Sequence, residues 1–178
     1  MTKRPWRTKS QRDNQKLRQV TEPGECVSVD QLESSTPGFI TQLKGKLTKQ
    51  RYHAATVFVD HFSGLSYVHM QRSLTSEETL EAKRAFEAFA RRHYVAIRHY
   101  HADNGRFADN AFITDATKQG QTLSYCGVNA HFQNGIAEKR IRDLQEQARK
   151  QLLHAKARWP SAIKINLWPS ALRNANEI

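Results

Sequence analysis

The sequence predicts an α/β fold in which helices flank a mixed five-stranded sheet. Two observations lead to this prediction. Strand-like and helix-like segments follow one another in the order strand, strand, strand, helix, strand, helix, strand, helix. The composition, with 38% hydrophobic and 25% charged residues, is ordinary for a globular domain, and 178 residues are enough to bury a core. A sheet of this kind offers strand ends at which side chains from several strands can converge.

The first 24 residues are predicted to form a basic extended arm or linker, because they lack hydrophobic periodicity and end in Pro23-Gly24. Residues 1–20 hold seven basic residues and one acidic residue, so they carry +6 of the net charge of +11. Such a segment gains affinity for a polyphosphate by releasing condensed counterions. A solvated linker or a localisation signal has the same composition, so the charge alone leaves these alternatives open.

Three strands are predicted in the first half of the chain, at Cys26–Leu32, Ala55–Phe62 and Leu65–Met70. Ser63-Gly64 forms a hairpin turn between the last two. Residues 33–51 contain turn formers and lysines and are predicted to form a long connection.

A helix is predicted to begin at the capping-box pattern Thr75-Ser76-Glu77-Glu78. Its apolar face consists of residues at spacings of three and four, namely Ala82, Ala85, Phe86, Phe89, Ala90 and His93. Further elements are predicted as a strand at 95–101, a short helix at 109–119 and a strand at 121–126. A long helix follows from Gly135 to about Ala155, with Ala137, Ile141, Leu144, Ala148 and Leu152 along its apolar stripe.

The C-terminal segment contains the tetrapeptide W-P-S-A twice, at 159–162 and 168–171. Proline is favoured just inside the start of a helix, so each copy is predicted to begin one. We divide the chain into the arm (1–24), a core (25–158) and a C-terminal helical segment of that core (159–178). Because the sequence stops within a helical pattern, we interpret this last segment as truncated.

Several classes of protein do not fit this sequence. No apolar run approaches the roughly 18 residues of a membrane helix, and no apolar segment follows the basic N-terminus as in a signal peptide. Cys26 and Cys126 are the only cysteines and have no CxxC spacing, so neither a disulfide framework nor a structural zinc site is expected.

Three carboxylates stand out by their context. Asp30 lies in the first predicted strand, Asp103 directly follows the fourth in H-A-D-N-G, and Glu138 lies in the first turn of the long helix. Two-metal phosphoryl transfer needs a few carboxylates to hold two divalent cations about 3.5–4 Å apart, and hard oxygen ligands suit Mg²⁺. Spacing alone does not single out this set, because Asp60, Asp109 and Glu146 are competing carboxylates.

Three stretches add a family resemblance: F-V-D-H-F-S-G-L-S-Y-V (58–68), H-A-D-N-G-R-F (101–107) and Q-N-G-I-A-E-K-R-I-R-D-L (133–144). Over about residues 25–178, the chain resembles the integrase core of copia-type long-terminal-repeat retrotransposons, within the retroviral integrase superfamily. The resemblance implies a ribonuclease H-like fold. It also implies an Asp-Asp-Glu catalytic and metal-binding triad made of Asp30, Asp103 and Glu138, and a structural role for Asp60.

The sequence departs from the family pattern in three places. Between Asp103 and Glu138 there are 34 residues, where the family typically has about 35. The loop before Glu138 reads A-H-F-Q-N-G instead of the usual T-P-Q-Q-N-G, and the first strand lacks the usual Gly-Pro after its aspartate. These departures affect the predicted DNA contacts and the assignment of Asp30 more than the assignment of Glu138.

The long helix also supplies a candidate DNA-binding face. Residues three and four apart share a face, so Glu138, Arg142, Gln145 and Arg149 line up beside the apolar stripe. Arginine can bind two phosphate oxygens at once; a Glu138–Arg142 salt bridge is the alternative role. The predicted DNA-binding residues are Asn134, Lys139, Arg142, Gln145 and Arg149, with Asn134 assigned by family position.

Other features receive more modest interpretations. Gly127 and Gly135 flank the loop before Glu138 and are candidate hinges. His99, His101 and His131 match no zinc spacing, so packing or DNA contact is preferred over metal binding.

The resemblance implies a polynucleotidyl transferase and endonuclease that processes the 3′ ends of an element's DNA and joins them to target DNA. It implies two Mg²⁺ ions, with Mn²⁺ as a substitute. The expected partners are element-end and target DNA and further copies of the chain, in the nucleus, without a membrane or small-molecule substrate. Two alternatives remain: an inactive or domesticated remnant that binds DNA, and a related ribonuclease H-like nuclease or transposase.

Overall fold

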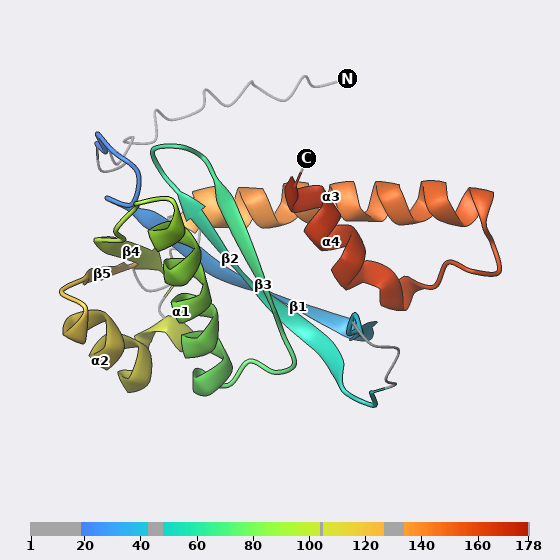
Figure 1. Cartoon of the computed structure of the whole chain (residues 1–178), viewed down its shortest axis with the longest axis horizontal. Helices are drawn as coiled ribbons and strands as arrows, with labels where there is room; N and C mark the ends of the chain where they lie inside the picture. Colours follow the sequence, from blue (N-terminus) through green and yellow to red (C-terminus); the bar gives the residue numbers. More distant parts are fainter. Residues whose placement is uncertain (1–18, 43–47, 104, 127–133, 178) are drawn as a thin grey trace, which may run out of the picture.

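The computed structural model of the chain describes residues 19–42, 48–103, 105–126 and 134–177. Its centre is a mixed five-stranded sheet with the strand order β3-β2-β1-β4-β5, as Figure 1 shows. β1 pairs antiparallel with β2, which pairs antiparallel with β3, while β1–β4 and β4–β5 are parallel. The strands are β1 (Val27–Phe39), β2 (Arg51–Asp60), β3 (Ser66–Gln71), β4 (His99–Ala102) and β5 (Thr122–Tyr125).

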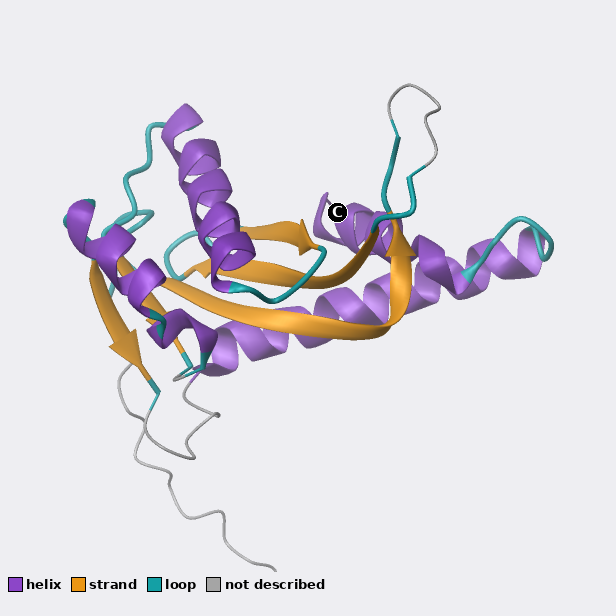
Figure 2. Cartoon of the chain, turned by 90° about the horizontal axis from the view of Figure 1, so that it is seen from below, coloured by secondary structure: helices purple, strands orange, loops and turns teal. Residues whose placement is uncertain are grey.

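Helices pack on both faces of this sheet (Figure 2). The helices are α1 (Ser76–Arg92), α2 (Asn110–Lys118), α3 (Gly135–Arg158) and α4 (Trp168–Glu177), with short 3₁₀ helices η1 (Arg106–Ala108) and η3 (Ile165–Leu167). The predicted fold class, a mixed five-stranded sheet flanked by helices, is confirmed. Among the described helices, none is both long and apolar enough to cross a membrane.

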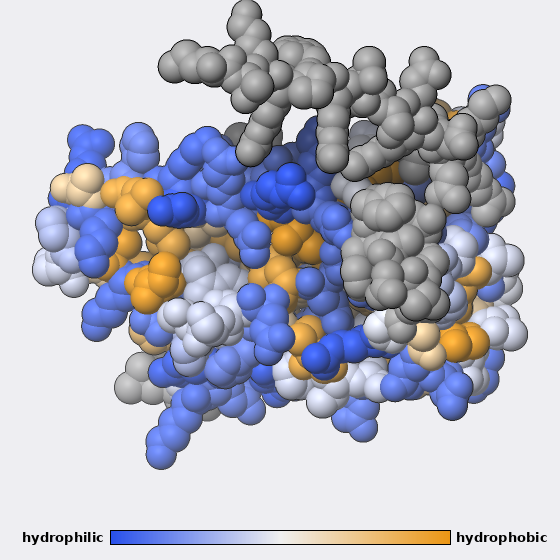
Figure 3. Space-filling model, turned by 180° about the vertical axis from the view of Figure 1, so that it is seen from behind, coloured by the Kyte–Doolittle hydropathy of each residue, from blue (hydrophilic) through white to orange (hydrophobic). Residues whose placement is uncertain are grey.

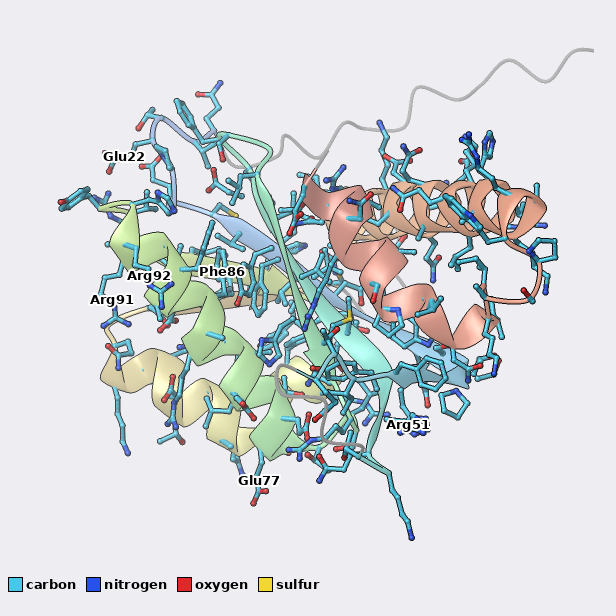
Figure 4. All side chains as sticks on the ribbon, turned by 45° about the vertical axis from the view of Figure 1, so that its right-hand side comes forward. Glu22, Arg51, Glu77, Phe86, Arg91 and Arg92 are labelled. Carbon is cyan, nitrogen blue, oxygen red and sulfur yellow. The ribbon has the colours of Figure 1, made fainter. Side chains whose placement is uncertain are left out.

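Two separate hydrophobic cores fill the layers on either side of the sheet. The core on the α1 side is rich in aromatic rings, and Phe58 of β2 stacks on Phe86 of α1 with ring centroids 4.6 Å apart. Figure 4 shows Phe86 directed from α1 toward the sheet. The core on the α3 side is mostly aliphatic and joins α3 and α4 to the sheet through Leu32, Ala55, Val57, Val59, Met70, Ile141, Leu144, Ala148, Trp168, Ala171, Leu172 and Ala175.

The capping-box pattern does begin α1, but only half of the box forms. Thr75 is the N-cap, and its side chain accepts a hydrogen bond from the backbone N–H of Glu78. The Glu78 carboxylate does not accept the reciprocal hydrogen bond from the backbone N–H of Thr75, because it binds the backbone N–H and the guanidinium of Arg72 instead. On the predicted apolar face, Ala82, Phe86 and Ala90 are buried, whereas His93 is exposed at the C-cap.

The prediction of a connection over 33–51 is wrong at both ends, because β1 continues to Phe39 and β2 (predicted as Ala55–Phe62) runs from Arg51 to Asp60. The ladder with β2 shifts register between Glu33 and Gly38. The extended backbone is held from outside the sheet: the Trp168 indole N–H donates to Thr36 O (2.8 Å), and the Asn166 side-chain amide donates to Pro37 O (2.8 Å). These tertiary contacts keep turn-forming residues in a strand.

Two further boundaries differ from the prediction. The fourth strand begins at His99 rather than Val95, because Val95 N–H caps α1 through Ala90 O and Arg98 N–H bonds Gly24 O. The first W-P-S-A does not begin a helix. Trp159 is the C-cap of α3, and the residues after it form a turn in which Ala162 and Ile163 donate to Trp159 O. The second W-P-S-A begins α4 as predicted.

Candidate active site

Strand geometry brings Asp30 and Asp103 side by side. Val29 of β1 and Ala102 of β4 are partners at the end of their parallel ladder, and each aspartate is the next residue. Side chains alternate along a strand. Val27, Val29 and Ala102 belong to the core on the α1 side, so Asp30 and Asp103 lie toward the α3 side. Both aspartates therefore lie at the same end of the β1–β4 ladder and on the same face of the sheet. We call this end of the ladder the carboxylate edge of the sheet.

Asn134 attaches the start of α3 to this edge. Its side-chain amide donates a hydrogen bond of 3.0 Å to the carbonyl oxygen of Val29, the residue before Asp30. Asn134 is the N-cap residue of α3, and Glu138 follows one turn later in the first turn of the helix. This hydrogen bond holds the start of α3, which carries the third predicted carboxylate, at the end of the β1–β4 ladder where Asp30 and Asp103 lie.

All three carboxylates affect the pKa of the Cys126 thiol, which directly follows β5. Burial is the main cause that raises its pKa, and the negative charges of Asp103, Glu138 and Asp30 raise it further. A thiol responds in this way only to charges that lie close enough to repel the thiolate. The three predicted carboxylates are therefore within electrostatic range of a single sulfur atom.

Within the described part of the chain, no three His, Cys, Asp or Glu side chains lie close enough together to form a metal-binding group. Carboxylates that share a site repel one another when no cation separates them. Each aspartate also accepts a local hydrogen bond, Asp30 Oδ1 from the N–H of Gln31 (2.8 Å) and Asp103 Oδ1 from the N–H of Gly105 (3.2 Å). The carboxylates are gathered at one edge without forming a tight cluster.

Asn134 is buried at the start of α3. Its side chain is only 1% exposed, and the amide is used inside the protein on β1. In this structure the Asn134 side chain has a structural role, and the DNA contact predicted for Asn134 stays a prediction. Its Oδ1 is buried and has no hydrogen-bond partner among the described residues.

The other predicted DNA-binding residues share the outer face of α3. Lys139, Arg142, Gln145 and Arg149 are all exposed. The opposite stripe of the helix, Ala137, Ile141, Leu144 and Ala148, is buried as predicted. No ion pair in the described residues joins Glu138 to Arg142, so the salt-bridge alternative is not formed.

The competing carboxylates all have structural partners. Asp60 is 5% exposed, and it accepts hydrogen bonds from the N–H of Gly24 and from the N–H and hydroxyl of Ser63. Asp109 caps α2, and its hydrogen bonds from Ser76 and from the N–H of Ala111 lower its pKa. Glu146 pairs with Lys150 on the surface of α3. None of these three joins the strand edge that carries Asp30 and Asp103.

A ladder of histidines and hydroxyls beside the carboxylates was not predicted. His99 bonds the hydroxyls of Thr122 and Ser124 (both 2.7 Å), and His101 bonds Ser124 Oγ (2.8 Å) and contacts Cys126 Sγ (3.6 Å). The signal was present in the sequence, because H-Y-H-A and T-L-S-Y place polar residues at every second position. These contacts favour hydrogen-bonded packing over metal binding for His99 and His101.

Several predictions lie outside the described residues. These are the arm over 1–18, the candidate hinge Gly127 and the loop residue His131. Gly135 is described and begins α3, and a Cβ added there would meet nothing within 4 Å.

No protein-family model matches the sequence, and a search of curated proteins found no match. Among solved structures, the chain is similar to the HTLV-2 integrase catalytic core domain in complex with magnesium, with a TM-score of 0.59 and 21% identity over 86% of this chain and 83% of that one. It is also similar to the BIV integrase catalytic core domain, with a TM-score of 0.54 and 15% identity over 86% of this chain and 81% of that one.

A third similar structure comes from a simian T-cell lymphotropic virus intasome in complex with PP2A regulatory subunit B56 gamma. Its TM-score is 0.62 and its identity 20%; the alignment covers 88% of this chain and 49% of that one. At these identities the similarity concerns the fold. The chain therefore has the ribonuclease H-like fold of retroviral integrase catalytic cores.

Proposed function

We propose that this chain is the catalytic core of a DNA integrase of a copia-type retrotransposon, with Asp30, Asp103 and Glu138 as its catalytic carboxylates. One observation carries the proposal: three acidic side chains far apart in sequence converge on one edge of an integrase-like sheet. The similarity to a magnesium-bound HTLV-2 integrase core supports the same type of chemistry.

The donor set fits Mg²⁺, and Mn²⁺ as its substitute, because all three donors are hard carboxylate oxygens. Neither Asp103 nor Glu138 takes part in an ion pair of the described residues, so their negative charge is available to a cation. In the proposed site Asp30, Asp103 and Glu138 would together hold two ions, which would supply activation of the attacking oxygen and stabilisation of the leaving oxygen.

The proposed reaction is phosphoryl transfer in two steps. Water first attacks a phosphodiester near the 3′ end of the element's DNA, so that the terminal nucleotides leave and a 3′-hydroxyl remains. That hydroxyl then attacks a phosphodiester of target DNA, and the new bond forms as the target bond breaks. The exposed side chains of Lys139, Arg142, Gln145 and Arg149 hold the DNA end along α3, which directs the reacting phosphate to the carboxylates.

A second candidate function is DNA binding without cleavage, as in an inactive or domesticated remnant. The absence of a tight group of metal-binding side chains in the described residues favours it. The two candidates differ in one measurable property, because only the enzyme joins DNA strands. The products of the reaction distinguish an integrase from related enzymes of the same fold. A nuclease would give cut strands without joined ones, and a transposase would join unrelated DNA ends.

The decisive experiment is a strand-transfer assay with labelled duplexes that carry the terminal sequence of the encoding element, in Mg²⁺ and in Mn²⁺. We expect joined products with the wild type and none with Glu138→Gln. Glu146→Gln is the matched control, because Glu146 lies on the same helix in an exposed pair and should leave the reaction unchanged. Strand transfer by Glu138→Gln would contradict the proposed triad. A wild type that binds these duplexes and never cuts them would favour the remnant.

Assembly and location belong to the same proposal. The similar HTLV-2 cores are described in trimeric and dimeric forms, and we propose that this chain also forms a homo-oligomer and acts in the nucleus. Sedimentation of the purified chain at several concentrations tests the first statement, and imaging of a tagged chain in the host cell tests the second.

A further inference from the structure

A second site lies on the α3 side of the molecule, at the end of α3 away from the proposed active site. A cavity of about 580 Å³ opens between the second half of α3, the segment before α4, and residues 32–35 of β1. This volume falls within the range of about 300–1,000 Å³ that is usual for ligand pockets. Along α3 the lining begins at Gln145, roughly 10 Å of helix rise from Glu138, and extends to Lys156, roughly 27 Å from it.

The floor of the cavity is aliphatic and belongs to the folded core. Leu32 and Leu172 line it and are 6% and 2% exposed, so they are held rigidly from below. At the opening, Leu153 and Ile165 are 58% and 62% exposed. Large apolar side chains left in water around an apolar hollow are typical of a surface that binds another protein. Figure 3 shows hydrophobic residues that surface among hydrophilic ones on this side of the molecule.

The charge around the cavity has one dominant sign. Residues 147–176 contain six lysine and arginine residues and no acidic residue. Arg149, Lys156 and Lys164 belong to the lining, and all three are exposed. Glu33, on the β1 wall, supplies the single carboxylate among the lining residues that the structure describes. An occupant that combines apolar side chains with negative charge on the α3 side therefore complements the cavity.

DNA supplies the negative charge that the cavity requires but not the apolar side chains. Its phosphates would meet the cations, but a duplex has no apolar projection to fill an aliphatic hollow. An unstacked base usually lies on an aromatic ring or a guanidinium. The aromatic residue of the lining, Trp168, is 9% exposed, and its indole N–H is bonded to Thr36 O. The cavity thus offers aliphatic contacts and little stacking surface.

We propose that this cavity is a docking site for an acidic peptide segment of a partner protein, with leucine-like side chains entering the cavity and carboxylates facing Arg149, Lys156 and Lys164. An amphipathic helix with apolar residues three and four apart has the required shape. The lining does not include the proposed catalytic carboxylates, but it shares Gln145 and Arg149 with the proposed DNA-binding face. Binding of a peptide is measured without any DNA-joining assay, so its failure is distinguishable from failure of the proposed catalytic function.

The test uses fluorescein-labelled 14-residue peptides of glutamate and alanine that carry leucines at positions i, i+3 and i+7 or at i, i+4 and i+7. Matched peptides replace the leucines by serine or the glutamates by glutamine. Fluorescence anisotropy at low and moderate salt should detect micromolar binding of the leucine–glutamate peptides. Both matched peptides should bind at least tenfold more weakly, and added salt should weaken the binding that remains.

Four variants complete the test. Lys156→Glu/Lys164→Glu and Leu153→Ser/Ile165→Ser should each weaken binding at least tenfold. Their melting curves should stay unchanged, because these side chains are exposed. Lys150→Glu is the control for charge, since Lys150 lies on the same helix outside the cavity lining and should change binding less than twofold. Arg91→Glu is a second control, on α1 and outside the cavity lining, and should have no effect on binding because Arg91 is exposed.

Three outcomes would overturn the proposal. The first is that no leucine–glutamate peptide binds with a dissociation constant below 1 mM. The second is that the glutamine peptides bind as tightly as the glutamate peptides, which would show that the partner need not be acidic. The third is displacement of the peptide by duplex DNA whose own affinity falls in the Leu153→Ser/Ile165→Ser variant, which would make the cavity part of the DNA surface.

Discussion

On the α1 side of the sheet, buried charges are paired with opposite charges, whereas on the α3 side three carboxylates gather near the end of the β1–β4 ladder. Lys83 of α1 has a fully buried side chain and lies 2.8 Å from Asp115 Oδ2 and 2.7 Å from Glu87 Oε1. The hydroxyl of Tyr100 also donates to Glu87, and Arg84 binds the other oxygen of Asp115. On the other side, Asp30, Asp103 and Glu138 all raise the pKa of the same thiol.

The two sides therefore use the same kind of residue for different purposes. A buried carboxylate with a cation fixes helix positions, and its loss costs stability. Carboxylates that lie near one another repel and lower stability, and such groups are typical of sites that bind a metal or a substrate. The same substitution, aspartate to asparagine, should consequently act in opposite ways on the two sides.

The largest expected effect is on activity. Asp103→Asn should lower strand transfer by about 1,000-fold, equivalent to roughly 4 kcal/mol of transition-state stabilisation, because a metal ligand is lost. Its melting temperature should be unchanged or higher, because one of three mutually repelling charges is removed. Asp115→Asn is the matched substitution on the other side and should do the reverse, with a lower melting temperature and unchanged strand transfer per folded molecule. Equal loss of stability in both variants would remove the contrast.

The next effect is on folding alone. Lys83→Met should destabilise the protein by about 3–4 kcal/mol, because it leaves the carboxylates of Asp115 and Glu87 buried without their cation. Urea unfolding gives this free energy directly. Arg84→Met is the control: its side chain is 65% exposed, so the loss should stay below about 1 kcal/mol. Similar losses in the two variants would show that burial of the lysine is unimportant.

A smaller effect is expected where β1 meets α4. A Cβ at position 38 would overlap Pro169 Cγ and lie 2.7 Å from Trp168 Nε1. Gly38→Ala should therefore cost about 1–3 kcal/mol, because the rings must shift or β1 must bend. Gly135→Ala is its partner experiment, since nothing lies within 4 Å of a Cβ there, and it should be neutral or slightly stabilising in the same urea titration. A neutral Gly38→Ala would mean that the end of β1 is free to move away from α4.

Acid should destabilise the protein by protonating Asp115, which belongs to the buried charge network on the α1 side. Burial raises the pKa of Asp115, but hydrogen bonds and charge from Lys83 and Arg84 outweigh it, so the pKa is lowered overall. A lowered folded-state pKa gives stability that is fully present above the unfolded value near 4 and is lost as the pH falls through the folded value. Melting temperatures measured from pH 7 to pH 3 should fall below about pH 4, and the fall should be shallower in Asp115→Asn. An identical pH profile for the two proteins would contradict this linkage.

The sequence predicted those parts of the molecule that depend on local signals. Thr75 caps a helix as its pattern indicated, and most of the predicted apolar stripes of α1 and α3 are buried, whereas His93 is exposed and Leu152 half-buried. Strand order and the register that places Asp30 beside Asp103 are not local. The family-like segments around Asp103 and Glu138 pointed to these residues, whereas their proximity follows from the pairing of β1 with β4 and from one hydrogen bond of Asn134.

The errors lie where local preference did not decide the structure. Residues 33–39 contain serines, Pro37 and Gly38, which favour a turn, yet contacts from Asn166 and Trp168 hold them in a strand. The first W-P-S-A favours the start of a helix, yet Trp159 is the C-cap of α3 and the residues after it form a turn. Tertiary contacts overrode local preference in residues 33–39, and a single sequence does not display such contacts.

The smallest effect gives the most direct test of how closely the three carboxylates approach one another. Burial contributes most to the raised pKa of the Cys126 thiol, so that pKa should stay raised in every variant. Asp103→Asn, Glu138→Gln and Asp30→Asn should each lower it in part, because each removes one charge that repels the thiolate, and Asp60→Asn should not. Titration of ¹³Cβ-labelled cysteine by NMR, with Cys26 replaced by serine, measures this pKa. Mg²⁺ should lower the pKa of the wild-type thiol in the same direction, since a cation beside the carboxylates cancels their charge. If all three variants left the pKa of Cys126 unchanged, the carboxylates would lie too far from one sulfur atom, and from one another, to share a metal site.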